Sequence, residues 1–224
     1  MSRHPEHSAD RPRERLMSAG PSALSDSELL ALLLAHGTRG HSALELAREL
    51  LERFEGLRGL LAAPRTRALA APGLGPARYC ALHAGIELAR RSVAADLRQR
   101  DALASPEQVG QYLALTLQRS PREVFVVLFL DSGNRLLAAD ELFHGTLNQT
   151  AVYPREVVRR SLEHNAAAVI LAHNHPSGVA EPSAADRLLT AALQRALAQV
   201  DIPVLDHLIV AGGRRYSFAE RGLL

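Results

Sequence analysis

The residues best suited to chemistry lie in one short stretch of the second half of the chain. His173 and His175 follow an apolar run, and Asp186 comes eleven residues after the second histidine. Side chains two residues apart on a strand point to the same side, so these imidazoles can bind one ion. Asp186 lies about one turn into a helix that Ser183 caps, where its carboxylate can face the strand end. Two histidines and one carboxylate leave a fourth position for water, which is typical of catalytic zinc rather than structural zinc.

The surroundings of the two histidines strengthen a signal that is weak by itself, because His-x-His pairs also occur without a metal. Here the pair leaves an apolar strand and precedes Pro176, Ser177 and Gly178, which turn the chain. The single cysteine, Cys80, excludes both an internal disulfide and a thiolate cage for zinc. Any metal must therefore be held by histidine and carboxylate, and zinc would lower the pKa of its bound water to about 7.

Such a site needs a strand, a turn and a helix, and the second half of the chain has the pattern to provide them. We expect strands over residues 123–130, 135–143, 166–172 and 204–210, and helices over residues 106–119, from Pro154 onward, and over residues 183–199. The turn at residues 131–134 predicts a hairpin between the first two strands. This order indicates an α/β or α+β fold, with a mixed sheet flanked by helices.

The first half of the chain has a helical pattern from about residue 11 to residue 91, with no strand. Ser25 with Glu28, and Ser42 with Glu45, have the spacing of capping boxes and predict two helix starts. A third helix should begin at Pro76. Residues 92–104 fit either a linker or an extension of that helix, and we place the boundary between domains there, giving an all-α domain over residues 1–100 and a second domain over residues 101–224.

The turn before Pro76 is similar to the hairpin of a helix-hairpin-helix module. Gly73 and Gly75 would let the backbone approach a phosphate, and Arg78 would add positive charge. Such a module binds the backbone of DNA without reading its sequence. The alternative is that the two glycines only form a tight turn between packed helices.

Composition limits the remaining functions. The 224 residues are 47% hydrophobic, which supplies the core of one large or two small domains, and the net charge of +2 means that DNA binding needs a local patch. The longest apolar runs fall well short of the roughly 20 residues that cross a bilayer. Residues 1–15 contain no apolar stretch, so we expect no secretory signal and a cytoplasmic protein without membrane contact.

The metal-site residues also resemble a known family. His173 and His175 followed by Ser183 and Asp186 match the spacing of the JAMM signature of the MPN (JAB) metalloprotease fold, a cytidine-deaminase-like mixed sheet. The amino-acid sequence from His173 to Gly178 is more narrowly similar to that of the bacterial RadC family, as are residues 145–148, 206–207 and 217–222. The resemblance covers nearly the whole chain. Residues 179–181 depart from the usual sequence of the family. This difference affects the detail of the loop and not the metal ligands.

The resemblance implies roles for five residues. Zn²⁺ would be bound by His173, His175 and Asp186, with water as the fourth ligand. Glu123 would be the general base beside that water, and Ser183 would help to stabilise the oxyanion. Without the resemblance, Glu123 is an ordinary exposed charge at the start of a strand and Ser183 is an ordinary helix cap.

Two functions follow from these patterns together with what the resemblance implies. The first is a zinc-dependent hydrolase, a peptidase or isopeptidase that acts on a peptide or protein, in which Glu123 deprotonates the zinc-bound water. The second is a DNA-binding accessory protein, related to repair, whose metal domain is structural or acts as a nuclease. The remaining histidines lack ligand spacing and are expected to be surface or structural groups, and His207, beside Asp206, is the first of them to inspect.

Overall fold

The computed structural model describes residues 11–117, 120, 122–145 and 152–224. They form two units, Met1–Glu87 and Leu88–Leu224, and each is described by itself. The domain boundary near residue 100 stays a prediction. Thr146, Leu147 and Asn148, which contribute to the RadC resemblance, lie outside the described residues. Among the described residues, no helix has the length and hydropathy that crossing a bilayer requires.

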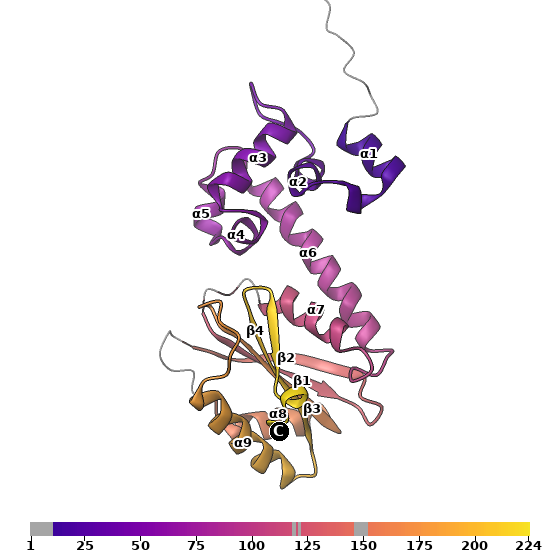
Figure 1. Cartoon of the computed structure of the whole chain (residues 1–224), viewed down its shortest axis with the longest axis vertical. Helices are drawn as coiled ribbons and strands as arrows, with labels where there is room; N and C mark the ends of the chain where they lie inside the picture. Colours follow the sequence, from indigo (N-terminus) through magenta and orange to yellow (C-terminus); the bar gives the residue numbers. More distant parts are fainter. Residues whose placement is uncertain (1–10, 118–119, 121, 146–151) are drawn as a thin grey trace, which may run out of the picture. The chain divides into compact units, whose positions relative to one another are not determined.

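The regular elements of unit 1 in its described part are helices, as the sequence predicts, apart from an isolated antiparallel bridge between Thr38 and His41. Its helices are α1 (Pro12–Ala19), α2 (Asp26–Leu34), α3 (Ala43–Arg53), α4 (Leu57–Ala62), α5 (Arg65–Leu69) and the first turns of α6 (Pro76–Leu97), with a short 3₁₀ turn, η2 (Pro21–Ala23), before α2 (Figure 1). Both predicted capping boxes are present, at Ser25 and at Ser42. Leucines and alanines of α2 and α3 form the centre of the buried core of this unit.

Helix α6 continues to Leu97, six residues beyond the predicted end at about residue 91. Of the two possibilities for residues 92–104, the structure therefore shows a helical extension as far as Leu97. No Gly or Pro interrupts this segment, and Ala94 and Leu97 are buried in the core of unit 2. Burial of these two side chains gives the last turns a packing partner.

Unit 2 is built on a mixed five-stranded sheet. The strands are β1 (Val124–Leu130), β2 (Leu136–His144), β3 (Ala168–Asn174), β4 (Val204–Ala211) and β5 (Arg214–Ser217), in the order β2-β1-β3-β4-β5. Strands β3 and β4 are parallel, and the other neighbours are antiparallel. The helices are α7 (Pro106–Leu117), α8 (Pro154–Glu163) and α9 (Ala184–Ala198), followed near the end of the chain by a 3₁₀ turn, η3 (Ala219–Arg221). The predicted fold class is confirmed.

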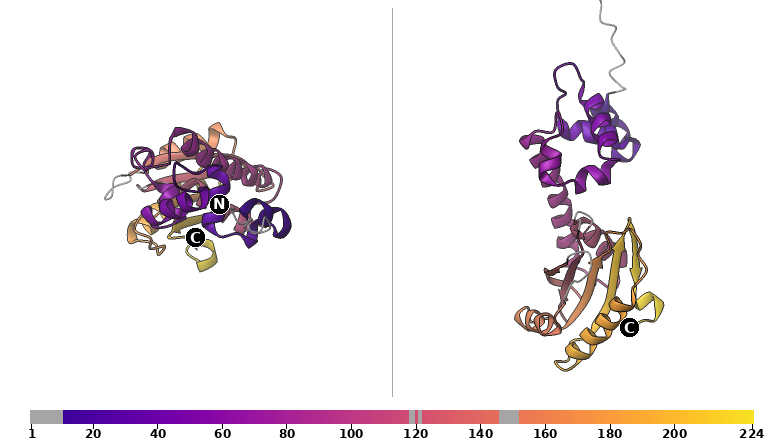
Figure 2. Two further views of the ribbon diagram at one scale, coloured as in Figure 1. Left: turned by 90° about the horizontal axis from the view of Figure 1, so that it is seen from above. Right: turned by 90° about the vertical axis from the view of Figure 1, so that its left-hand side faces the viewer.

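Helices cover both faces of this sheet, which explains why every residue of β1 is buried. Alternate residues of β1 point to opposite faces. Val124, Val126, Leu128 and Leu130 pack in one core with α7 and the end of α6, whereas Phe125, Val127 and Phe129 pack in another core with α8 and α9. Figure 2 shows α8 and α9 on the same side of the sheet.

Strand β5 is absent from the sequence prediction, which ended with a strand followed by a short tail. It pairs with β4 through a tight turn in which Gly212 and Gly213 both have positive φ angles, 57° and 83°. A Gly-Gly pair between two strands is the usual signal of a two-residue hairpin. The signal was present, but the four residues of β5 are too few to show a clear alternation.

Candidate metal centre

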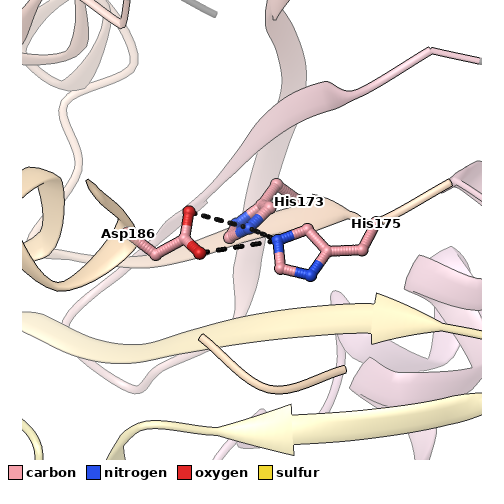
Figure 3. A group of neighbouring side chains, drawn as sticks. All are labelled: His173, His175 and Asp186. Atoms are coloured by element: carbon pink, nitrogen blue, oxygen red, sulfur yellow. Dashed lines mark hydrogen bonds and ion pairs between the residues drawn. The ribbon is translucent and has the colours of Figure 1, made fainter. Parts of the chain in front are cut away.

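Three side chains converge at the end of β3 (Figure 3). The Nε2 atoms of His173 and His175 are 2.9 Å apart. Asp186 Oδ1 lies 3.3 Å from Nε2 of His173, and Oδ2 lies 3.5 Å from Nε2 of His175. All three ligand atoms lie within 4.8 Å of one another, so the group can hold a metal ion.

Strand β3 and helix α9 bring these residues together. His173 is inside β3 and faces the layer of α8 and α9, because it shares its face with Val169 and Leu171. His175 directly follows the strand and points the same way. Asp186 is the third residue of α9 and is 7% exposed. The predicted arrangement of strand end, turn and helix therefore positions the group.

Ser183 holds Asp186 in place. Its backbone N–H and its hydroxyl both donate to Asp186 Oδ2, each at 2.7 Å, and its Oγ accepts from the backbone N–H of Asp186 at 3.1 Å. This is a capping box, so the predicted capping role of Ser183 is confirmed. Since Oδ2 already accepts two hydrogen bonds, Oδ1 is the oxygen left to bind a cation.

The imidazole of His175 is oriented by the loop that follows it. Its Nδ1 lies 2.8 Å from the carbonyl oxygen of Val179, which can only accept, so Nδ1 carries the proton and Nε2 faces the centre. The hydrogen bond with Asp186 raises the pKa of His175 against the opposing effect of burial, and the charge of Glu123 contributes to the increase. The side chain of His175 is 17% exposed, compared with 1% for His173. The centre is therefore open to solvent on the His175 side.

The carboxylate of Asp186 stays ionised at ordinary pH. Burial alone would raise its pKa, but the contacts with His173 and His175 and the hydrogen bonds from Ser183 lower the pKa far below the usual range of an aspartate. A buried anion facing two imidazole nitrogens is a favourable place for a divalent cation.

The donor set fits zinc. It contains two imidazole nitrogens and one carboxylate oxygen, the combination found in catalytic sites that keep a fourth position open. The distances of 2.9 and 3.3 Å from His173 Nε2 are close to the roughly 3.3 Å between ligand atoms of a tetrahedral zinc ion. Without a cation or a proton between them, lone pairs at these separations would repel each other.

A third histidine lies directly behind the centre. His207 of β4 is fully buried, and its Nε2 is 2.8 Å from Nδ1 of His173. Burial lowers the pKa of His207 well below its ordinary value. The sequence indicated that this residue should be inspected but gave it no role, because the contact is made across two neighbouring strands and has no characteristic spacing along the chain.

Glu123 lies directly before β1. It is partly exposed, its carbonyl oxygen accepts from the N–H of Gly145 at 2.8 Å, and its charge contributes to the raised pKa of His175. Its role as general base stays a prediction.

Asn174, between the two histidines, fixes the segment that carries Glu123. Its side chain points to the opposite face of β3, where Oδ1 accepts from the N–H of Val124 at 2.8 Å. Its amide group donates to the carbonyl oxygens of Arg122 at 3.0 Å and Ser120 at 3.4 Å. No prediction from the sequence included Asn174, although a polar amide at the end of a buried apolar strand is a usable signal.

Arg78 of unit 1 binds backbone carbonyl groups of its own unit. Its Nε donates to Leu34 at 3.2 Å, Nη1 to Gly73 at 2.6 Å, and Nη2 to Gly37 at 2.8 Å and to His36. Leu34 is the last residue of α2, so Arg78 satisfies carbonyls that the end of a helix leaves unpaired. These bonds give Arg78 a structural role, and DNA binding through it stays a prediction.

The two glycines of the same turn differ in their surroundings. Gly73 has a φ angle of 79°, and a Cβ there would come within 2.5 Å of the side chain of Leu46, so glycine is required for the turn and its packing. Gly75 has no atom within 4 Å of its Cβ position. The surroundings of Gly73 match the tight-turn alternative, and a phosphate contact at Gly75 stays a prediction.

Comparison with known proteins identifies both parts of the chain. A model described as RadC-like JAB domain matches residues 103–223, and one described as UPF0758 N-terminal matches residues 5–80. A UPF0758 protein of Methylibium petroleiphilum is 60% identical over 214 residues, and one of Nitrosospira multiformis is 56% identical over 216 residues. Both alignments cover 96% of this chain and 96% of the relative. The chain therefore belongs to the family of proteins that join a UPF0758 N-terminal domain to a RadC-like JAB domain.

Proposed function

We propose that the protein is a zinc-dependent hydrolase of the JAMM type, a peptidase or isopeptidase. One observation supports this above all others: His173, His175 and Asp186 direct two ring nitrogens and one carboxylate oxygen at a common point that is open on one side. A structural zinc site is normally closed by four protein ligands, whereas this one provides three within the part of the chain that the structure describes.

The chemistry divides between the ion and the chain. When bound, zinc would act as a Lewis acid and lower the pKa of a coordinated water. Glu123 would accept a proton from the attacking water and return it to the leaving amine. Its backbone is held for this task by Gly145 and, through the neighbouring residues, by Asn174.

Ser183 is the proposed source of an oxyanion contact. In the structure its hydroxyl donates to Asp186 Oδ2, so this role requires the hydroxyl proton to turn from Asp186 toward the substrate. The capping contact from the backbone N–H of Asp186 to Oγ can persist during this change, because it uses a lone pair of the hydroxyl and not its proton.

The proposal is tested with the purified full chain and two variants. Elemental analysis of protein prepared without added metal should show zinc, and His173→Ala should abolish it. Glu123→Gln, by contrast, should keep both the zinc and the melting temperature of the wild type, while hydrolysis of a degenerate fluorogenic peptide library or of an isopeptide-linked lysine substrate falls by at least about 100-fold.

Two results would contradict the proposal. One is unchanged zinc content in His173→Ala. The other is a Glu123→Gln variant as active as the wild type. Cleavage of DNA by the wild type, without cleavage of either peptide substrate, would replace the peptidase by the nuclease alternative.

A further inference from the structure

A chain of buried hydrogen bonds connects two of the three candidate ligands behind the centre. It runs from His173 Nδ1 to His207 Nε2 at 2.8 Å, from His207 Nδ1 to Thr190 Oγ1 at 2.6 Å, and from Thr190 Oγ1 to the carbonyl oxygen of Asp186 at 2.6 Å. His173, His207 and Thr190 are each 1% exposed or less. The donors in this series of hydrogen bonds therefore cannot turn to bulk water instead.

The backbone carbonyl at the end determines which atom donates at every step. The carbonyl of Asp186 can only accept, so it takes the single hydroxyl proton of Thr190. Thr190 Oγ1 must then accept from His207, which places a proton on Nδ1 of His207. A neutral His207 has a lone pair on Nε2, so Nδ1 of His173 is the donor between the two rings. Nε2 of His173 is left with its lone pair, facing Asp186 and His175.

We propose that His207 and Thr190 are positioning residues that hold His173 in the tautomer able to bind a metal through Nε2. This inference rests on the proposed metal site. A ligand histidine commonly donates its second ring N–H to a protein acceptor, which fixes both tautomer and ring orientation. Here His207 is that acceptor. Thr190 accepts from Nδ1 of His207 and so leaves the lone pair of His207 on Nε2.

The positions of the two histidine ligands explain why Nδ1 of His173 needs a side chain as its acceptor. His175 lies beyond the end of β3 and reaches a loop carbonyl, that of Val179. His173 lies inside β3, between β1 and β4, where the backbone carbonyls are used by the sheet. The acceptor must therefore come from a neighbouring side chain, and His207 on β4 provides it.

Aromatic packing fixes the plane of the His207 ring. Phe218 stacks on it with ring centroids 4.8 Å apart and an interplanar angle of 23°. Phe125 meets it edge to face at 5.7 Å and 69°. A ring held in this way cannot rotate to offer a different atom to His173 without displacing two buried phenylalanines.

The tautomer can be measured directly. Long-range ¹H–¹⁵N NMR of the full chain, with ¹⁵N-labelled histidine and metal removed by a chelator, should show the proton of His173 on Nδ1 and that of His207 on Nδ1. A wild-type His173 protonated only on Nε2 would overturn the proposal. This readout needs neither bound metal nor hydrolysis, so it fails or succeeds separately from the proposed function.

Matched variants test whether the hydrogen bonds from His173 through His207 to Thr190 control zinc binding. Thr190→Val removes the group that orients His207, whereas Thr190→Ser keeps it. We expect Thr190→Val to weaken zinc binding by about 10-fold to 100-fold in competition with a chromophoric chelator, and Thr190→Ser to stay close to the wild type. In Thr190→Val the proton of His173 should also appear on Nε2.

Replacement of His207 provides the second pair. His207→Leu should lower zinc affinity by a similar factor, and His207→Gln, whose amide oxygen can accept from His173, should restore part of it. Circular dichroism and melting temperature show whether each variant is folded. If His207→Leu does not fold, the comparison of Thr190→Val with Thr190→Ser tests the positioning role. Equal zinc affinity and an equal His173 tautomer in Thr190→Val and the wild type would refute the positioning role of His207 and Thr190.

Discussion

The two carboxylate oxygens of Asp186 have different tasks. Oδ2 accepts two hydrogen bonds from Ser183, and Oδ1 faces Nε2 of His173. The same residue thus takes part in the cap of a helix and offers an anionic ligand. At the scale of single residues, the candidate site is therefore inseparable from the start of α9, because the contacts that orient the ligand are also the contacts that cap the helix.

Substitution of Ser183 tests this double use. Ser183→Ala removes the helix cap and one donor to Asp186 Oδ2, so we expect the free energy of unfolding to fall by about 1 kcal/mol. Zinc affinity should fall as well, because Asp186 gains rotational freedom. Urea denaturation and chelator competition measure the two effects. Ser183→Thr, which keeps the hydroxyl, is the control, and a Ser183→Ala variant as stable as the wild type would show that the cap contributes nothing.

Strand β3 uses its two faces for different purposes at the scale of elements. His173 and His175 carry ligand atoms on one face, while Asn174 fastens the segment before β1 on the other. The strand therefore sets the position of Glu123 relative to the ligands.

Asn174→Ala should separate metal binding from turnover. It leaves the N–H of Val124 and the carbonyl of Arg122 without their side-chain partner, which costs about 1–3 kcal/mol of stability. We expect zinc content to stay near the wild-type value while kcat on the peptide library falls by about 10-fold or more. Asn174→Asp keeps the acceptor for Val124 but loses the donors, so its kcat should lie between the two. A kcat unchanged in Asn174→Ala would mean that the segment needs no such support.

Strand β2 is tied to α8 by a partly buried charge network. Asp140 accepts from Nε of Arg160 and from Nε2 of His164, both at 2.8 Å. Burial alone would raise the pKa of Asp140, but the hydrogen bonds from His164 and Arg160 and their charges lower it below its ordinary value.

This lowered pKa predicts a pH-dependent stability. A carboxyl group whose pKa is lower in the folded state contributes stability above its unfolded pKa, and the contribution is lost as the pH falls through the folded pKa. Asp140→Asn should therefore lower the melting temperature by about 2–5 °C at pH 7. The difference from the wild type should shrink as the pH falls below about 4. Melting curves at several pH values measure it, and a constant difference would exclude the charge network as its cause.

Local signals predicted much of this architecture. The capping boxes at Ser25 and Ser42, the helix cap at Ser183 and the apolar run before His173 are recognisable because each depends on neighbours within a few residues. The pairing of His173 with His207 depends on which strands lie side by side, and that is decided by packing of the whole sheet. For the same reason, the sequence could propose the three ligands but not the group that orients one of them.

At the scale of the whole molecule, every group of the candidate centre belongs to unit 2. The core of this unit also includes Ala94 and Leu97 from the end of α6, which are 6% and 1% exposed. The match to the RadC-like domain begins only at residue 103. A fragment chosen from the sequence match alone would therefore lack part of the hydrophobic core.

Two fragments test where the stable unit begins. A fragment of residues 88–224 should unfold cooperatively, whereas one of residues 101–224 should be less stable by at least about 2 kcal/mol, because the site of Leu97 becomes a cavity or is exposed to water. Urea denaturation followed by circular dichroism measures both. Equal midpoints would show that the end of α6 adds nothing to this core.

The alternation of β3 also limits how the family can change. Removing a single residue inside the strand would exchange its two faces, so that ligand histidines would point toward α7 and the amide toward α9. Removing two residues would preserve the faces but shorten the reach of the strand. Insertions and deletions of odd length should therefore be purged from the strand itself.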